Sequence, residues 1–276
     1  MADHSIRLMV HSAFVVMFVL LLQSHIAISQ EVDEELEFSY QEGSEAGPEH
    51  WGHIHKDWAA CGNGRMQSPV DLSDERVRIL PLLGRLRRSY RPAAAVLRNR
   101  GHDIMLRFEG DAGSVRIYGS EYALKQLHWH SPSEHTINGR RFDMELHMVH
   151  QSADNRTAVV GILYTFGRRE PFLGEMERYM EMITDKHEAE EEVGMVDPRK
   201  IRRGSRKYYR YMGSLTTPPC TEGVVWTIIN KVRTVSREQV RLLREAVDDD
   251  SSRNARPTQE INDRGIGLFR PRRKGY

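Results

Sequence analysis

The sequence has little of the features that would point to a function at once. It contains two cysteines in 276 residues, and its 40 basic residues almost balance 39 acidic ones, for a net charge of +1. It has no internal repeat and no low-complexity linker, and its aromatic content of 8% is ordinary. Without a basic excess, the composition gives no indication of nucleic-acid binding. The length suits one large domain or two small ones.

Long apolar runs are also scarce, and the longest is Ala13 to Leu22, near the N-terminus. A basic start precedes it, and Ala27-Ile28-Ser29 follows with the small-x-small pattern of a signal-peptidase site. We expect residues 1–29 to be a secretory signal peptide and residues 30–276 to form the mature domain. A membrane anchor is the alternative, but ten residues span about 15 Å of helix against roughly 30 Å of hydrocarbon. The expected location is therefore the secretory pathway, outside the cell or in an organelle on that route, with no membrane span in the mature protein.

The two cysteines gain meaning in an oxidising compartment. Cys61 and Cys220 are the only pair available, so we expect one disulfide that closes a very long loop. Two separate buried thiols would be the expectation for a cytosolic protein. Asn155 opens the only Asn-x-Ser/Thr sequon and is a candidate glycosylation site.

Most of the chain between Tyr90 and Tyr164 has the pattern of short strands. Turn residues separate Ile104–Phe108 from the run 114–118, and Tyr122–His130 alternates. Asn138-Gly139 between alternating runs predicts a hairpin, and the continuous apolar run Thr157–Tyr164 predicts a strand buried on both faces.

Helical patterns are few. They occur at residues 171–184 and 236–247, and no regular alternation of strands and helices accompanies them. The acidic cluster Glu188–Glu192 and the basic cluster Arg199–Arg210 are typical of solvated faces. The expected fold is a mainly β single domain with a large, mostly antiparallel central sheet and a few peripheral helices.

Three histidines lie in phase on two strands of this pattern. His128 and His130 in the run QLHWH are two positions apart, so both side chains point to one face, about 7 Å apart along the strand. In FDMELHMVH, after the Asn138-Gly139 turn, His147 shares a face with Glu145, while His150 has the opposite phase. The pattern predicts a metal site formed by His128, His130 and His147, with His150 outside it.

Three imidazoles without a fourth protein ligand are typical of a catalytic zinc ion with an open position. Gln126 and Glu145 each precede a candidate ligand by two residues on the same face, and are candidate hydrogen-bond partners of those histidines. A single histidine would be interpreted as an ordinary buried or surface residue. Two in-phase histidines on one strand, followed across a hairpin by a third, favour a metal site. Cobalt or iron would also fit three imidazoles in vitro.

A cupin-type metal enzyme is a minor alternative. His128-x-His130 followed by Glu134 matches the core of the cupin motif, in which the glutamate is a ligand. That motif also needs two glycines, and their positions hold Tyr122 and Arg141. The cupin hypothesis predicts that Glu134 binds the metal.

Longer blocks carry a resemblance to a known family. They are GPEHWGHIHKDWAACGNGRMQSPVDL, RNRGHDIMLRFEG, QLHWHSPSEHT, ELHMVH and YMGSLTTPPCTEGVVWTI. Together they resemble the α-class carbonic anhydrases, in particular the secreted plant type, over about residues 38–270. The resemblance implies a zinc-dependent reversible hydration of carbon dioxide to bicarbonate and a proton, in which zinc-bound hydroxide attacks CO₂.

The resemblance also implies a role for each matching residue. His128, His130 and His147 match the zinc ligands, and Gln126 and Glu145 match the partners of His128 and His147. Thr216, oriented by Glu134, would orient the hydroxide and, with Thr217, help to bind bicarbonate. Tyr40 matches the tyrosine of the hydroxide network, and His102 matches the proton shuttle. The family's apolar residues around bound CO₂ are matched by Val149, Val159, Leu215, Val224 and Trp226. Cys61 and Cys220 match the disulfide of secreted members.

Two positions depart from the family pattern. Arg100 and Met105 stand where relatives often carry asparagines that order the water chain, which puts fast proton transfer in doubt. The rival within the family is a non-catalytic storage or binding protein on the same scaffold, although no metal ligand is missing here. The expected partner is a small molecule, CO₂ or bicarbonate.

Overall fold

The computed structural model describes residues 37–184, 186–247 and 251–271. The predicted signal peptide therefore lies outside the described residues. The first described helices are short: α2 (Trp51–Ile54), η1 (Lys56–Trp58), α3 (Ala60–Asn63) and η2 (Pro81–Leu83). The two longer helices are α4 (Pro171–Ile183) and α5 (Arg237–Glu245), and η3 spans Pro198–Lys200. None of the described helices is long and apolar enough to cross a membrane.

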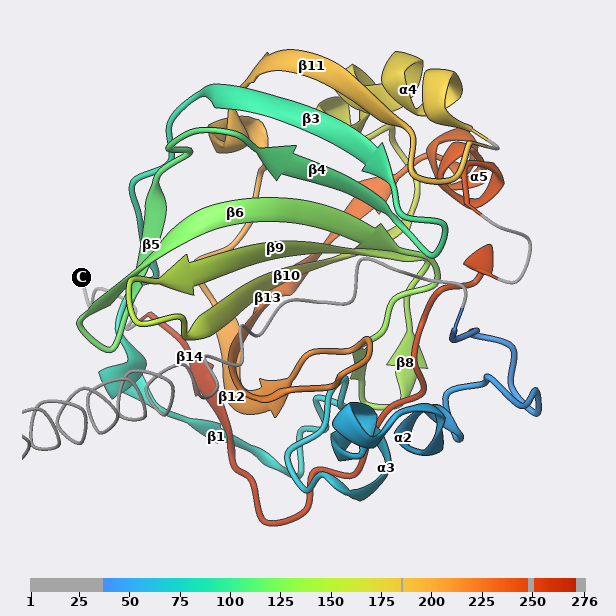
Figure 1. Ribbon diagram of the computed structural model, residues 1–276. Helices are drawn as coiled ribbons and strands as arrows, with labels where there is room; N and C mark the ends of the chain where they lie inside the picture. The colour runs from blue at the N-terminus through green and yellow to red at the C-terminus, as the bar shows by residue number, and fades with distance from the viewer. Residues whose placement is uncertain (1–36, 185, 248–250, 272–276) are drawn as a thin grey trace, which may run out of the picture. The chain divides into compact units, whose positions relative to one another are not determined.

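Strands make up most of the remaining structure (Figure 1). The main sheet contains β1 (Val77–Ile79), β2 (Arg87–Arg88), β3 (Ala93–Asn99), β4 (Ile104–Phe108), β5 (Ser114–Ile117), β6 (Ser120–His130), β9 (Met144–Ser152), β10 (Thr157–Phe166), β11 (Glu190–Val196), β12 (Tyr208–Ser214), β13 (Glu222–Val235) and β14 (Ile266–Phe269). A separate two-stranded sheet pairs β7 (Thr136–Ile137) with β8 (Arg140–Arg141).

The main sheet is mixed but mostly antiparallel. Its order is β1-β14-β12-β13-β10-β9-β6-β4-β3-β11, and off this path β5 pairs with β6 while β2 pairs with β5. Only the pairs β1–β14 and β10–β13 are parallel. The predicted fold class is confirmed. Near the middle of this order, the neighbouring strands β6 and β9 pair antiparallel, with His128 opposite His147.

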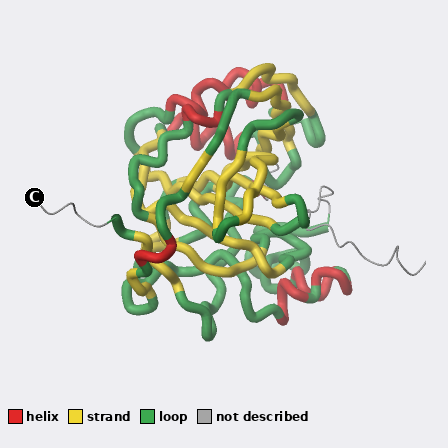
Figure 2. Tube along the Cα trace, turned by 90° about the vertical axis from the view of Figure 1, so that its left-hand side faces the viewer, coloured by secondary structure: helices red, strands yellow, loops and turns green. Residues whose placement is uncertain are grey.

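The two faces of the central sheet pack against two different apolar clusters. One face joins the larger apolar core, which includes Leu127, Trp129, Leu146 and Met148 and the buried sides of α4 and α5. The helices lie at the periphery of the fold (Figure 2). The opposite face packs in part against a smaller apolar cluster around Trp226. Because strand side chains alternate, the same strands present histidines to one side and leucines to the other.

One turn and two helix N-termini have the residues that their local geometry requires. Asn138 and Gly139 have φ angles of 50° and 74° and form the turn between β7 and β8, as a two-residue hairpin loop requires. Ser236 and Gln239 form a reciprocal capping box at the start of α5. At the start of α4, Glu170 accepts a hydrogen bond from the backbone N–H of Leu173 at 2.7 Å.

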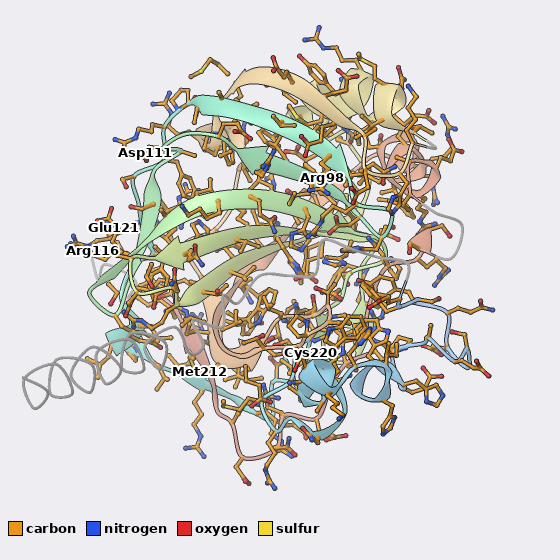
Figure 3. The ribbon with its side chains drawn as sticks, viewed as in Figure 1. Arg98, Asp111, Arg116, Glu121, Met212 and Cys220 are labelled. Carbon is orange, nitrogen blue, oxygen red and sulfur yellow. A yellow bond between two sulfur atoms is a disulfide. The ribbon has the colours of Figure 1, made fainter. Side chains whose placement is uncertain are left out.

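The predicted disulfide is confirmed. Cys61 in α3 is bonded to Cys220, and the two cysteines are 159 positions apart in the sequence. Figure 3 shows Cys220 next to the short helices of the N-terminal part. The bond packs in an aromatic cluster whose other buried members are Phe38, Tyr40, Trp51 and Trp58. The loop that carries Thr216 and Thr217 is thereby fixed to the N-terminal part of the domain.

Candidate metal centre

Three imidazoles converge on one face of the strand pair β6–β9. The ring centroids of His128 and His130 are 5.0 Å apart, those of His128 and His147 5.0 Å, and those of His130 and His147 4.6 Å. One nitrogen from each ring lies within 4.8 Å of the others. All three side chains are buried. The structure therefore brings together the three residues that the strand phase singled out.

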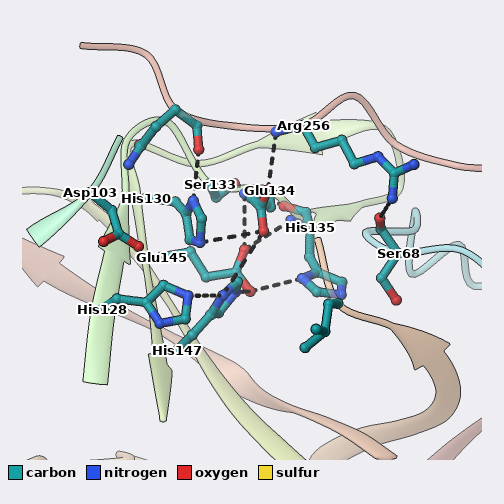
Figure 4. A network of polar contacts seen from close by, with 12 residues as sticks. Ser68, Asp103, His128, His130, Ser133, Glu134, His135, Glu145, His147 and Arg256 are labelled. Atoms are coloured by element: carbon teal, nitrogen blue, oxygen red, sulfur yellow. Dashed lines mark hydrogen bonds and ion pairs between the residues drawn. The ribbon is translucent and has the colours of Figure 1, made fainter. Parts of the chain in front are cut away.

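Each imidazole is held through its other nitrogen. Figure 4 shows the three rings together, with Glu134 and Glu145 beside them. Gln126 Oε1 accepts a hydrogen bond from His128 Nδ1 at 2.8 Å, and the carbonyl oxygen of Asn254 accepts one from His130 Nδ1 at 2.7 Å. His147 Nε2 lies 3.0 Å from Glu145 Oε1. These contacts leave Nε2 of His128, Nε2 of His130 and Nδ1 of His147 to face one another.

The donor set fits a metal ion. His130 Nε2 is buried and has no hydrogen-bond partner among the described residues. His147 Nδ1 and His128 Nε2 are 3.2 Å apart, so two ring nitrogens point at the same small volume. A buried polar atom without a partner is costly, and a shared cation would satisfy all three nitrogens. Three neutral imidazoles are a donor set that suits zinc.

Glu145, which contacts His147, is itself held by several hydrogen bonds. Its Oε1 accepts a hydrogen bond from His135 Nδ1 at 2.8 Å, and its Oε2 accepts from the backbone N–H groups of Glu134 and His135 at 3.0 and 2.8 Å. Burial alone would raise the pKa of Glu145, but His135 and His147 outweigh it and hold that pKa well below the usual range. His135, Glu145 and His147 also form a group with metal-ligand geometry. With both carboxylate oxygens already occupied, Glu145 is better suited to orient His147 than to bind a metal.

Burial controls the charge of the first candidate ligand. The pKa of His128 is lowered well below its ordinary value, mainly because the ring is desolvated, while the nearby Asp103 partly opposes the shift. A neutral imidazole is the form that binds a metal. The folded environment thus favours the ligand form of His128 at neutral pH.

Glu134 lies beside the open side of the centre. Its Oε2 is 3.5 Å from His130 Nε2 and 3.9 Å from His147 Nδ1. Its Oε1 accepts a hydrogen bond from the backbone N–H of Arg256 at 3.0 Å, whereas Oε2 has no hydrogen-bond partner among the described residues. The expected hydrogen bond from Thr216 is therefore not formed in this structure, although Thr216 is buried.

The five apolar residues expected around the CO₂ pocket lie close together. Val159, Leu215, Val224 and Trp226 belong to one buried cluster, and Val149 packs against it. The Trp226 ring centroid is 4.8 Å from that of His147, so this cluster borders the metal centre directly. Thr217 is buried too, and its hydroxyl has no hydrogen-bond partner among the described residues.

Two predicted residues come from the N-terminal half. Tyr40 packs edge-on against Phe38 and Trp51 in the aromatic cluster. His102 lies in the bend just before β4, at the start of the strand as expected, but its side chain is only 2% exposed. The ring of Phe38 covers it, with ring centroids 5.3 Å apart.

The remaining predicted positions lie away from the centre or beside it. His150 points to the opposite face, where its Nε2 is 2.7 Å from the hydroxyl of Tyr90. Asn155 is exposed in the turn between β9 and β10, with a φ of 60°. Met105 is the register partner of His128, and Arg100 is buried in an ion pair with Asp103.

Several supporting residues were missed by sequence reasoning. His135 Nε2 is 2.7 Å from the hydroxyl of Tyr211, which in turn is 2.8 Å from Ser68 Oγ. Asn254 and Arg256 hold His130 and Glu134 through their backbone atoms. His135 directly follows Glu134, and this adjacency was a usable signal, but backbone contacts from residues more than 120 positions away leave no pattern in the sequence.

A mixed sheet that carries three converging imidazoles on two adjacent strands defines a β protein with a candidate metal site. Residues 46–269 match the family model of eukaryotic-type carbonic anhydrases, and the chain belongs to this family of lyase-type enzymes. It is 55% identical over 258 residues to alpha carbonic anhydrase 7 of Arabidopsis thaliana, covering 94% of each chain.

Solved structures show the same relationship. A crystal structure of dioscorin complexed with ascorbate has a TM-score of 0.82 and 49% identity, covering 84% of this chain and 98% of that one. The α-carbonic anhydrase from Thermovibrio ammonificans with the inhibitor sulfanilamide has a TM-score of 0.77 and 33% identity, covering 83% and 98%. The resemblance read from the sequence is confirmed.

Proposed function

We propose that this chain catalyses the reversible hydration of carbon dioxide with a zinc ion held by His128, His130 and His147. The observation that carries the proposal is the convergence of three ring nitrogens whose opposite nitrogens are held by Gln126, Asn254 and Glu145. Bound there, zinc would lower the pKa of a water molecule to about 7 and supply hydroxide at neutral pH, for which carbonic anhydrase is the standard case.

The chain's own residues would bind and orient the reactants. The apolar side chains Val149, Val159, Leu215, Val224 and Trp226 would keep water from the space where CO₂ sits. Thr216 would orient the attacking oxygen by donating its own proton to Glu134, and its backbone N–H, with Thr217, would help to hold bicarbonate. Oε2 of Glu134, which accepts no hydrogen bond from any of the described residues, is the acceptor that this role needs. Tyr40 would contribute to the hydrogen-bonded network at the same site.

His102 would carry the proton away. An imidazole with a pKa near 6.5 can accept and release a proton at neutral pH. We expect His102→Ala to slow hydration in dilute buffer while zinc content stays unchanged, and added imidazole to restore much of the rate. Because Arg100 and Met105 replace the usual ordering groups, the expected loss is moderate. Equal rates for the two proteins at low buffer would exclude the relay.

The matching experiment for the whole proposal is a CO₂-hydration assay with metal analysis on the purified protein. We expect about one zinc per chain and a rate far above that of buffer. A zinc-loaded protein without activity would support the second candidate, a binding protein on the same scaffold. The specific observation in favour of that candidate is the 49% identity to dioscorin, whose crystal structure contains ascorbate.

We also propose the maturation route. Residues 1–29 would be removed as a signal peptide, residues 30–276 would form the mature domain, and the chain would enter the secretory pathway. The Cys61–Cys220 bond supports this route because disulfides persist in oxidising compartments. The exposed Asn155 is accessible to glycosylation. Mass spectrometry of the secreted protein would locate the N-terminus, expected at Gln30, and reveal any glycan.

A further inference from the structure

The turn that carries Asn155 borders a groove that has no part in the proposed catalysis. The groove has a volume of about 830 Å³, and Asn155 is one of the residues that line it. Its walls come from the segment before β3, the turn between β4 and β5, the first half of β6 and the end of β9. The candidate ligands His128 and His130 lie at the other end of β6. The other lining residues are Ser89, Arg91, 108–114, Glu121, 123–125 and 151–153.

A change of strand partner in β6 opens this groove. β6 pairs with β5 at residues 120–123 and with β4 at residues 126–128. Opposite β9 the register also shifts between Leu124 and Gln126, so Lys125 is skipped on both sides of the strand. A residue without a ladder partner bends its strand and leaves the space beside it without a neighbouring backbone. The groove is therefore a consequence of the sheet topology.

Hydrogen bonds hold the Asn155 turn in one conformation at the rim of the groove. The backbone N–H of Asn155 donates to the carbonyl oxygen of Ser152 at 3.0 Å, and Ser152 Oγ donates to Asp154 Oδ1 at 2.6 Å. Arg156 Nη2 donates to Ser120 Oγ at 3.0 Å, which connects the turn to the start of β6. Asn155 has a φ of 60°, in the left-handed region that asparagine tolerates. A group attached to Asn155 therefore starts from a fixed point beside the groove.

The groove wall carries the groups that bind sugar hydroxyls. Carboxylates accept hydrogen bonds, and side-chain amides both donate and accept them. The groups of this kind that line the groove on exposed or half-buried side chains are Glu109, Asp111, Glu121 and Gln151. Figure 3 shows Asp111 and Glu121 on the same side of the molecule. Asp111 also pairs with Arg91, and Glu121 accepts from Ser114 Oγ. A carboxylate has about four acceptor sites, so both keep capacity for a hydroxyl.

We propose that the N-linked glycan of Asn155 folds back into this groove, where its first sugars bind the polar wall. The inference rests on the proposed glycosylation of Asn155. In that step a bond forms between Asn155 Nδ2 and the anomeric carbon of the sugar donor, the bond from that carbon to the donor's lipid-linked phosphate breaks, and Nδ2 loses one proton. The volume of the groove is in the range of pockets that hold small-molecule ligands.

The bound glycan would stabilise a corner of the sheet that has few backbone hydrogen bonds. β2 has two residues and β5 has four, and β2 pairs only with β5 among the described strands. Sugars in the groove would contact the turn between β4 and β5 and the end of β9 at the same time. Local opening of this corner would then break contacts with the glycan, so the glycan lowers the population of the open form.

The test compares one sequence with and without the glycan. The glycosylated protein is obtained by secretion from eukaryotic cells, and the bare protein from a bacterial periplasm, which permits the disulfide. We expect backbone amides of residues 109–113 and 121–125 to exchange hydrogen about 5- to 30-fold more slowly in the glycosylated protein, the effect of one or two ordinary hydrogen bonds. Its Tm should be about 3 °C higher. Enzymatic removal of the glycan from the folded glycoprotein, which converts Asn155 to aspartate, should abolish both differences.

A relocated glycan is the first control. The double variant Asn155→Asp/Arg140→Thr removes the native sequon and creates an Asn-Gly-Thr sequon at Asn138. Asn138 is also an asparagine in a tight turn, with a φ of 50°, but it does not line the groove. A glycan at Asn138 should therefore leave exchange in the groove segments at the rate of the bare protein.

The second control removes polar groups from the groove wall. In Glu121→Ala/Gln151→Ala, the Tm difference between the glycosylated and bare forms should fall to less than about half of its wild-type value. Comparing the two forms of one variant cancels the direct effect of the substitutions on stability. The matched variant Gln259→Ala changes a half-buried glutamine outside the groove and should leave the difference unchanged.

The failures can be told apart. Secreted protein without a glycan on Asn155 refutes the proposed glycosylation, and this inference with it. A glycosylated Asn155 with the exchange rates of the bare protein refutes the inference alone. Equal protection by the Asn138 glycan, or a Tm difference that Glu121→Ala/Gln151→Ala leaves intact, would also overturn it, because the effect would not depend on the groove. None of these measurements uses CO₂ hydration, so they are independent of the catalytic proposal.

Discussion

His147 and His150 lie three residues apart on β9, and both are almost completely buried. His147 faces Glu145, His128 and Trp226 on one side of the sheet. His150 faces Tyr90 and the carbonyl oxygen of Ala158 on the other. The two histidines have the same chemistry and similar burial, so their neighbours alone separate a candidate metal ligand from a structural residue.

The charge of the neighbours is the main difference. Among the described residues His150 has only uncharged hydrogen-bond partners, and burial lowers its pKa to about 4, so it is a neutral imidazole at neutral pH. The His147 face contains the buried acids Glu134 and Glu145, and ring nitrogens that point at one another. Buried acids can compensate a cation, whereas neutral partners cannot.

The largest expected effect is the difference between the single variants His147→Ala and His150→Ala. His147→Ala should abolish zinc retention and hydration, as should His128→Ala or His130→Ala, because two imidazoles hold the metal too loosely to acidify water. His150→Ala should keep one zinc and most of the activity. Zinc content and hydration rates, measured on the same preparation of each variant, test this expectation. Full activity in His147→Ala would disprove the metal centre.

The next effect concerns the open side of the centre. Thr216→Ala and Glu134→Gln should each keep zinc but lower kcat by about 100-fold, because in the proposed mechanism both residues orient the attacking oxygen and neither binds the metal. Rates and zinc content are again the measurements. Zinc loss in Glu134→Gln would favour the cupin-like alternative, in which this glutamate binds the metal.

A smaller effect is expected from the carboxylate that holds His147. Glu145→Gln should weaken zinc affinity about 10- to 100-fold, because the amide cannot match the charge that orients His147. Competition with a chelator measures the affinity. The corresponding change on the other face, Tyr90→Phe, removes the partner of His150 and should leave zinc affinity unchanged. If both variants retain wild-type affinity, the comparison between the two faces fails.

The smallest effect is a pH dependence of stability on the His150 face. The folded-state pKa of His150 is about 4, below its ordinary 6.5, so the unfolded chain binds the proton first as pH falls. The stabilising contribution is complete above pH 6.5 and is lost between pH 6.5 and 4, by about 2 kcal/mol at pH 5. Urea unfolding of wild type and His150→Gln at pH 7 and 5 tests this. An unchanged pH slope in the variant would contradict it.

Much of the site could be predicted because successive side chains on a strand point to opposite faces. The phase of His128, His130 and His147, and the opposite phase of His150, follow from alternation alone. The supports Asn254 and Arg256 could not be predicted, because each holds its partner through backbone atoms from a segment without regular structure. Backbone contacts place no requirement on side-chain type, so they leave no sequence signal.

The edge of the sheet shows a similar limit. β11 pairs with β3, although its sequence EEEVGMV has the charged character of a solvated segment. An edge strand needs fewer apolar residues, because one of its long sides has no neighbouring strand and charges there prevent unwanted pairing. The acidic cluster is therefore exposed, as expected, but the strand itself was missed.

The most direct test of the account is X-ray absorption at the zinc edge of the purified protein, combined with zinc stoichiometry. The structure predicts one zinc per chain, bound by three imidazole nitrogens and no protein carboxylate. Fewer than three imidazoles, or a carboxylate among the ligands, would contradict the central claim that strand phase on β6 and β9 builds the metal centre.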